Sequence, residues 1–284
     1  MHIRHKALSN FMRAMESIAP LSLADRSWDN VGLLLESPTV VDNPCRVLLT
    51  VDLTEPVYNE AVNKGISIIL AYHPPWFRGE KSLTLDQSRG MMRMVTLCAA
   101  SGISIYSPHS ALDAIRGGVN DHVVDIITDK TFEKSVPIQS VSNGDNDCGV
   151  GRIVSLTAPE SIRNIVKRWC EYVKIPNLRV ALPDGVTLDD SVDSIAVCVG
   201  SGATVLNGAE ASLYFTGEMS HHEILKANIA HNAAVILTEH TNCERGFLRD
   251  VLRQRLVDEL EKSDTPFEIC VSKVDRDPIE IVSV

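Results

Sequence analysis

Short apolar runs rich in β-forming residues alternate along the chain with longer stretches of helical periodicity, and this alternation constrains the fold most. It is typical of β-α-β units that build a largely parallel sheet. Strands are expected over Arg46–Val51, Ser67–Ala71, Ile103–Ser107, Ile195–Gly200, Leu213–Thr216, Ala233–Thr238 and Phe267–Ser272. Helices are expected over His5–Ile18, Glu55–Asn63, Leu85–Ala100, Val119–Ile127, Pro159–Val173, Ser220–His231 and Glu244–Glu261. The sequence therefore predicts an α/β fold with largely parallel or mixed sheets.

The middle of the chain departs from this alternation. The stretch SVSNGDNDCGVG has the composition of a turn-rich linker, and Gly149–Thr157 after it resembles a strand. We therefore expect three segments: an N-terminal α/β half over residues 1–130, a connector with some structure over 131–193, and a C-terminal α/β half over 194–284 that completes the site described below.

Composition excludes several classes of protein. No run of about eighteen apolar residues occurs, so a membrane span is not expected. The net charge of −10 disfavours nucleic acid as a partner, because non-specific binding to phosphates needs a positive field. Seven scattered cysteines without a C-x-x-C pair indicate reduced thiols and a cytoplasmic protein. The N-terminal MHIRHKALSNFMRAM favours an amphipathic helix, with a mitochondrial presequence as the alternative, and a nuclear pool stays open.

Histidines and acids gather just after the ends of four predicted strands. They are His73, then His109 and Asp113, then His221 and His222, then His240 and Glu244. The carboxyl ends of parallel strands share one edge of an open sheet, and ligands bind at that edge. Histidines scattered over a surface or a core would have no reason to follow this rule. The pattern therefore predicts a site in which these side chains converge.

The spacing of these residues suits a metal. His240 and Glu244 are four residues apart, as are His109 and Asp113, so each pair would lie on one face of a helix. Imidazole with carboxylate favours zinc, manganese, iron or nickel, and bridging carboxylates would allow two ions about 3.5–4 Å apart. The alternatives are structural: His73 could donate to a loop carbonyl, and Asp113 could cap a turn.

The segment GSGAT begins after another predicted strand. Backbone amides of Gly200, Ser201 and Gly202 could bind a phosphate there. The alternative, a tight strand-to-helix turn, is at least as consistent with so short a motif.

Six ordered blocks together resemble the Nif-three family (Ngg-one-interacting factor three), whose members are often labelled GTP cyclohydrolase type two homologues. The blocks are SWDNVGLLLE (Ser27–Glu36), ILAYHPPWFRG (Ile69–Gly79), IYSPHSALDAIRGGVN (Ile105–Asn120), GSGAT (Gly200–Thr204), YFTGEMSHHEILKA (Tyr214–Ala227) and LTEHTNCERGFL (Leu237–Leu248). The resemblance runs nearly end to end. It implies a two-part α/β fold, a dinuclear metal centre, and a toroidal homohexamer described as a trimer of dimers.

The resemblance also carries over residue roles. The family's metal ligands fall on His73, Asp113, His240 and Glu244, with His109 as the next candidate. Tyr72 stands where many bacterial members carry a first histidine, a form similar to the eukaryote-type branch. A neutral phenol is a poorer ligand than an imidazole, so the resemblance implies one or two divalent ions per chain.

Two functions from different classes follow. The first is a metal-dependent hydrolase acting on a small nucleotide-like substrate, such as GTP, with Tyr72, His221 or His222 moving protons and Gly200–Gly202 holding a phosphate. The second is a non-catalytic scaffold that binds metal or a protein partner, such as a transcriptional co-regulator. Direct DNA binding is the least supported, because the chain is acidic.

Overall fold

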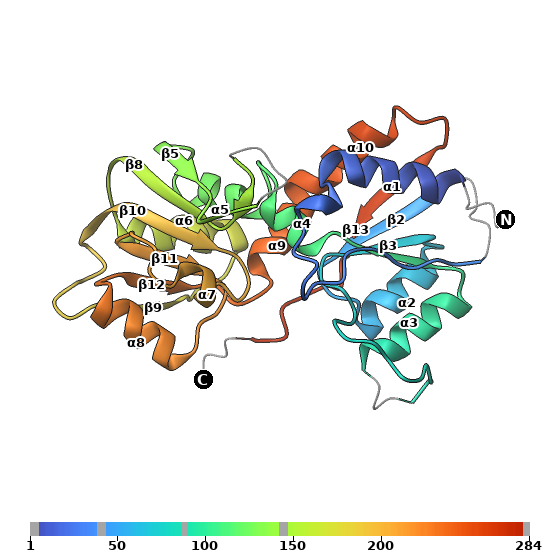
Figure 1. The fold of residues 1–284 in the computed structure, drawn as a ribbon, viewed down its shortest axis with the longest axis horizontal. Helices are drawn as coiled ribbons and strands as arrows, with labels where there is room; N and C mark the ends of the chain where they lie inside the picture. The colour runs from blue at the N-terminus through green and yellow to red at the C-terminus, as the bar shows by residue number, and fades with distance from the viewer. Residues whose placement is uncertain (1–5, 39–43, 87–89, 142–146, 281–284) are drawn as a thin grey trace. The chain divides into compact units, whose positions relative to one another are not determined.

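The computed structural model describes residues 6–38, 44–86, 90–141 and 147–280. It contains two compact units (Figure 1): unit 1 comprises residues 1–112 and 247–276, and unit 2 comprises residues 113–246 and 277–284. Each unit has its own mixed sheet with helices, so the predicted two-part α/β fold with mixed sheets is confirmed. Among the described residues, no helix combines the length and the apolar character needed to cross a membrane.

Unit 1 is built on a five-stranded sheet in the order β1-β4-β3-β2-β13. The strands are β1 (Gly32–Leu35), β2 (Cys45–Thr50), β3 (Ile68–Ala71), β4 (Ser104–Ser107) and β13 (Phe267–Val271). The last four run parallel, and β1 pairs antiparallel with β4 at the edge. Every residue of β3 and β4 is buried, as expected for central parallel strands covered on both faces.

Two pairs of helices cover this sheet (Figure 1). α1 (Lys6–Ile18) and α10 (Arg253–Leu260) lie on one face, and α2 (Glu55–Asn63) and α3 (Met91–Ala100) lie on the other. Phe11 of α1 packs edge-on against Tyr106 of β4, with ring centroids 5.5 Å apart. Residues 6–18 therefore pack as the expected amphipathic helix.

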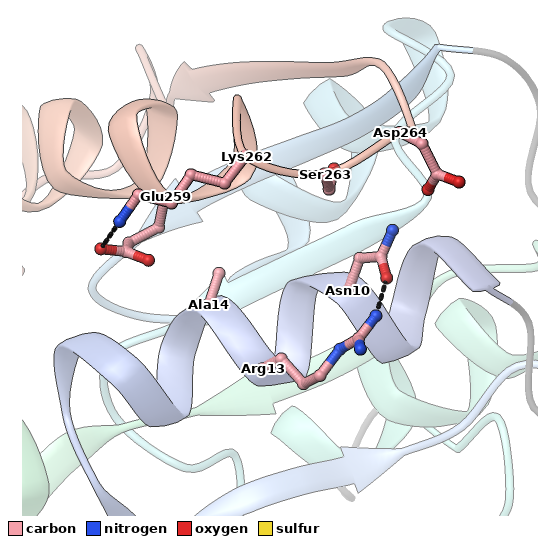
Figure 2. Close-up of a pocket in the computed structure, with 7 residues that line it drawn as sticks. All are labelled: Asn10, Arg13, Ala14, Glu259, Lys262, Ser263 and Asp264. Carbon is pink, nitrogen blue, oxygen red and sulfur yellow. Dashed lines mark hydrogen bonds and ion pairs between the residues drawn. The ribbon is translucent and has the colours of Figure 1, made fainter.

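A pocket of about 400 Å³ lies between α1 and the end of α10 (Figure 2). It is lined by Asn10, Arg13, Ala14, Glu259, Lys262, Ser263 and Asp264. Its charged groups are already engaged: Arg13 with Asn10, Lys262 with Glu259, and Asp264 with Lys6. It contains none of the candidate site residues.

Unit 2 is built on a six-stranded mixed sheet in the order β5-β8-β10-β11-β12-β9. The strands are β5 (Phe132–Val136), β8 (Arg152–Ser161), β9 (Arg179–Ala181), β10 (Ser191–Cys198), β11 (Leu213–Thr216) and β12 (Ala234–Leu237). β10, β11 and β12 run parallel, while β5, β8 and β9 pair antiparallel with their neighbours. β6 (Gln139–Ser140) and β7 (Gly149–Val150) form a separate short hairpin.

Helices pack on unit 2's sheet through apolar side chains. Trp169 of α6 (Ile162–Val173) is fully buried and meets Phe215 of β11 at a centroid distance of 5.1 Å. α5 (Val119–Ile127) packs beside α6. Leu206 of α7 (Ala203–Leu206) and Ala227 of α8 (His221–Ala230) belong to another buried cluster, with alternate residues of β10, β11 and β12.

Several element boundaries differ from the sequence prediction. Residues 159–161, expected to begin a helix, instead finish β8, and Ser161 caps α6 through a hydrogen bond from the Asn164 amide. α3 begins at Met91 rather than Leu85, and residues 87–89 of that expected helix lie outside the described residues, as does His5 of the first helix. The helix expected over Glu244–Glu261 is α9 (Asn242–Phe247), a π-helical turn over Leu248–Leu252, and α10.

The predicted connector, residues 131–193, supplies strands β5, β8 and β9 and helix α6 to unit 2. The chain passes between the two units inside helix α4 (His109–Ala114) and again inside α9. The division into segments 1–130, 131–193 and 194–284 stays a prediction about domain organisation.

The cysteines give a first testable prediction. Burial raises the pKa of Cys45 and of Cys98 to about 12, whereas Cys170 and Cys270 are partly exposed. Because only the thiolate reacts, we expect Cys170 and Cys270 to react first with a disulfide reagent at pH 8. Mass mapping of labelled peptides over time checks this order, and rapid labelling of Cys45 or Cys98 in the folded chain would contradict it.

Candidate metal centre

In unit 1, His73 is held just past the end of β3. The His73 amide donates to the Val51 carbonyl (3.1 Å), continuing the pairing of β2 with β3. β3 itself ends at Ala71, and the two prolines after His73 have no amide to donate, so the pairing cannot continue past His73. The imidazole Nδ1 lies 2.9 Å from Oδ1 of Asp52, which itself follows β2. The hydrogen bond to Asp52 therefore fixes the orientation of the His73 imidazole just past the ends of β2 and β3.

His109 opens α4 directly after β4 and repeats this arrangement. Its Nδ1 lies 2.8 Å from Oδ1 of Asp29, a carboxylate whose side chain is fully buried. The amide and hydroxyl of Ser110 also donate to Asp29. Burial alone would raise the pKa of Asp29, but the hydrogen bond and charge of His109 and the Ser110 bonds outweigh it, so the pKa lies below its ordinary value. Asp29 is thus an ionised acceptor for His109.

The two imidazoles of unit 1 are neighbours. Their ring centroids are 5.2 Å apart, and the buried Tyr72 ring lies 5.2 Å from His73 and 5.4 Å from His109. His73 and His109 keep 14% and 12% of their side chains exposed, so both remain accessible at the surface of unit 1.

In unit 2, His240 and Glu244 meet beside a glycine. The Nδ1 of His240, which follows β12, lies 2.9 Å from Oε1 of Glu218, which follows β11. Gly200 has a φ of +61°, and a Cβ added there would lie 3.2 Å from Nε2 of His240 and 3.5 Å from Oε1 of Glu244. A side chain at Gly200 would therefore crowd Nε2 of His240, touch Glu244 at ordinary van der Waals distance, and force a strained backbone.

Asp113 of α4 lies in the same part of unit 2. Burial raises the pKa of the Cys198 and Cys243 thiols, and the charges of Asp113 and Glu244 raise both further. The two carboxylates therefore act on the same buried thiols. Cys243 is fully buried next to Thr238, which agrees with a small core group rather than an exposed ligand.

Three imidazoles thus share one chemical pattern. Each Nδ1 faces a carboxylate and therefore carries a proton, so in the neutral ring Nε2 is the atom with the free electron pair. The candidate group of ligands consists of His73 in unit 1 and of His240 and Glu244 in unit 2, each of which offers one ligand atom. The partner carboxylates Asp52, Asp29 and Glu218 were missed by the sequence analysis, although the strand-end rule applied to acids would have selected Asp52 and Glu218.

Other predicted site residues take different positions. His221 and His222 are exposed at the start of α8, with rings 5.3 Å apart, and the candidate group does not include them. The Gly202 amide donates to the Thr216 hydroxyl (3.1 Å), and a Cβ at Gly202 would come within 2.5 Å of that oxygen. Gly202 therefore fits closely in a tight turn.

Comparison with known proteins places the chain in a family. The family model described as Duf34/NIF3 (NGG1p interacting factor 3) matches residues 6–278. The Protein NIF3 homolog of Schizosaccharomyces pombe is 42% identical over 95% of this chain and 96% of its own length. The NGG1-interacting factor 3 of Saccharomyces cerevisiae is 36% identical over 98% of each chain. The chain belongs to the Duf34/NIF3 family, which confirms the resemblance found in its motifs.

A solved structure has a similar fold. The Staphylococcus aureus hypothetical protein SA1388 superimposes with a TM-score of 0.79 at 21% identity, covering 97% of this chain and 99% of that one. At that identity the likeness concerns the fold alone.

Proposed function

We propose that the chain binds divalent metal through His73, His240 and Glu244, with His109 and Asp113 as further ligands, and acts as a metal-dependent hydrolase. The observation that carries the proposal is the set of three imidazoles whose Nδ1 atoms face carboxylates. Such carboxylate–imidazole pairs are the usual support for metal-bound histidine. The nitrogen and oxygen donors suit zinc, iron, manganese or nickel.

Helices α4 and α9 carry three of the proposed ligands. α4 carries His109 and Asp113 one helical turn apart, so both side chains project from the same face. α9 carries Glu244. These are the two helices inside which the chain passes from one unit to the other. The carboxylate of Asp113 or Glu244 could also bind a second ion.

A divalent ion bound by these residues would supply Lewis-acid activation of water near neutral pH. The chain's own residues would hold and orient the substrate and move protons. Exposed His221 and His222 are suited to proton transfer, and Tyr72 lies against both unit 1 imidazoles. The amides of Gly200 and Ser201 remain the proposed phosphate contacts. A small nucleotide-like substrate would use the metal, the acid–base groups and the phosphate contacts together. GTP is the first such substrate to test.

Activity tests the hydrolase directly. Protein loaded separately with zinc, iron, manganese or nickel is incubated with GTP, and products are followed by chromatography and mass spectrometry. We expect turnover with at least one metal, abolished in His240→Ala. Failure to convert GTP or other nucleotides at high enzyme concentration would contradict the hydrolase.

The second candidate function is a non-catalytic scaffold, favoured by a specific observation. Tyr72 occupies a buried position against His73 and His109, where an imidazole would add another nitrogen ligand. The yeast relative's name, NGG1-interacting factor 3, records a protein partner for that relative. If this chain acts by binding a protein partner in the cytoplasm or nucleus, its metal would have a structural or regulatory role.

Metal stoichiometry before and after Tyr72→His separates the two functions. Two tightly held ions per wild-type chain support the enzyme. One weakly held ion that becomes two in Tyr72→His, with partner binding intact in His240→Ala, supports the scaffold. Elemental analysis of purified protein after dialysis measures both variants.

The proposal includes assembly into a toroidal homohexamer, a trimer of dimers. The mass of the particle in sedimentation equilibrium tests it, with six times the 31.2 kDa chain expected and a monomer contradicting it.

A further inference from the structure

Two aromatic side chains beside His109 are left half exposed. Trp28 and Phe77 expose 52% and 47% of their surface, although large apolar side chains are normally buried. Their ring centroids lie 6.1 Å apart with a 32° angle between the planes. Together they form an aromatic surface on unit 1 that the proposed ligands do not account for.

This aromatic surface is next to the candidate metal ligands. The His109 ring lies 5.6 Å from Trp28 at 89°, and 5.9 Å from Phe77 at 59°. The Nδ1 of His109 is engaged by Asp29, which fixes the plane of the imidazole. Anything stacked on Trp28 or Phe77 would therefore lie next to the His109 ring.

Hydrogen bonds hold Trp28 in place. The indole Nε1 donates to Oδ2 of Asp25 (3.0 Å), and the Ser27 amide and hydroxyl donate to Oδ1 of the same carboxylate. The Asp25 amide in turn donates to the Ser110 hydroxyl (3.3 Å), which ties this loop to the start of α4. The indole's polar atom is thus satisfied within the chain, and its exposed part is apolar ring.

The loop that carries Phe77 is tied to the loop that carries Trp28. The Asn30 side-chain amide donates to the Trp76 carbonyl at 2.7 Å. The two loops are therefore tied together, and the Trp28 ring is also held by its hydrogen bond to Asp25. Such ordering lowers the entropy lost on binding, because the side chains need not be immobilised by the ligand.

We infer that Trp28 and Phe77 form a stacking platform for a flat heteroaromatic ring, of the nucleobase class, in the substrate of this site. Every nucleobase has a π-face that stacks on aromatic side chains without hydrogen-bond readout. The Nε1 group is already satisfied, so stacking rather than hydrogen bonding to the indole is the mode left. This inference deepens the proposed function and rests on it for the metal beside the ring.

A matched pair of probes isolates the ring. GMP and ribose 5-phosphate share a sugar phosphate and differ in the base, so the difference in their affinities reports the contribution of the ring. Calorimetric titration of the full chain is expected to give tighter binding of GMP. Trp28→Ala is expected to weaken GMP binding by roughly 5- to 150-fold, the usual range for loss of one stacking contact, and to leave ribose 5-phosphate unchanged.

Further variants keep the test independent of folding. Phe77→Ala is expected to weaken GMP binding in the same direction, and Trp28→Phe to retain most of it. Leu83→Ala removes another exposed apolar side chain of unit 1, 60% exposed, and should change nothing. Circular dichroism confirms that each variant is folded.

The results of these titrations distinguish the stacking platform from the metal site. GMP binding no tighter than ribose 5-phosphate, or unaffected by both alanine variants, overturns the platform. A variant that changes the particle mass but not GMP binding also overturns it, and assigns the rings to a protein interface. Metal content is measured on the same samples: a wild type without metal that still loses GMP affinity in Trp28→Ala refutes the metal site and leaves the platform standing.

Discussion

His240→Ala is expected to weaken metal binding by more than roughly 100-fold, because it removes a ligand outright and losing a partner that orients a ligand already costs about 10- to 100-fold. Glu218→Gln is expected to weaken metal binding by about 10- to 100-fold, because Glu218 orients a ligand and is not one itself. The amide can still accept from Nδ1 of His240 but no longer carries the charge that makes the imidazole a better donor. Competition with a chromogenic chelator measures both affinities.

A histidine of the same unit provides the control. His231 is exposed at the end of α8 and has no role in the proposed site, so His231→Ala should keep the wild-type affinity. Equal affinities for His240→Ala and His231→Ala would remove His240 from the ligand set.

Arg152→Ala is expected to destabilise unit 2 by about 3–5 kcal/mol, the usual cost of breaking a buried ion pair from one side. The Arg152 side chain is 2% exposed and makes two bonds to Asp121, at 2.6 and 2.9 Å. It also donates to the carbonyls of Gly149, Gly151 and Ile115. Alanine would remove the guanidinium donor from these three carbonyls and leave Asp121 with the Gly117 amide but without its ion pair. Urea unfolding followed through Trp169, which lies in unit 2, measures the loss.

The matched comparison is an exposed arginine of the same unit. Arg163 pairs with Asp189 at 2.6 Å, but both side chains are more than half exposed. Water and salt screen that pair, so Arg163→Ala should leave the urea concentration at the midpoint of unfolding unchanged. A loss for Arg152→Ala no larger than for Arg163→Ala would contradict the buried-pair account.

The sequence predicted the parallel cores well, and the reason is local. Each central strand is a short apolar run closed by polar or turn residues, so β2, β3, β11 and β12 fall within about one residue of their expected limits. Edge strands carry a weaker pattern: β5 and β9 are half exposed and were not predicted. Their pairing depends on contacts distant in sequence, which periodicity does not encode.

The candidate site was predicted in part for a similar reason. The strand-end rule found that His73 and His240 follow the ends of parallel strands. Its single shared sheet edge was wrong, because β3 belongs to the sheet of unit 1 and β12 to the sheet of unit 2. It could not find Asp29, which lies in a loop before β1 and reaches His109 across eighty residues. Likewise, the return of β13 beside β2 follows from tertiary packing, since the last strand in sequence joins the first sheet.

Metal content of the purified wild-type chain tests the central claim most directly. Inductively coupled plasma mass spectrometry, after exposure to zinc, iron, manganese and nickel and exhaustive dialysis, should find at least one ion per chain. The double variant His73→Ala/His240→Ala should hold none while keeping the wild-type circular dichroism spectrum. A folded wild type without stoichiometric metal, or a double variant that keeps its metal, would contradict the account.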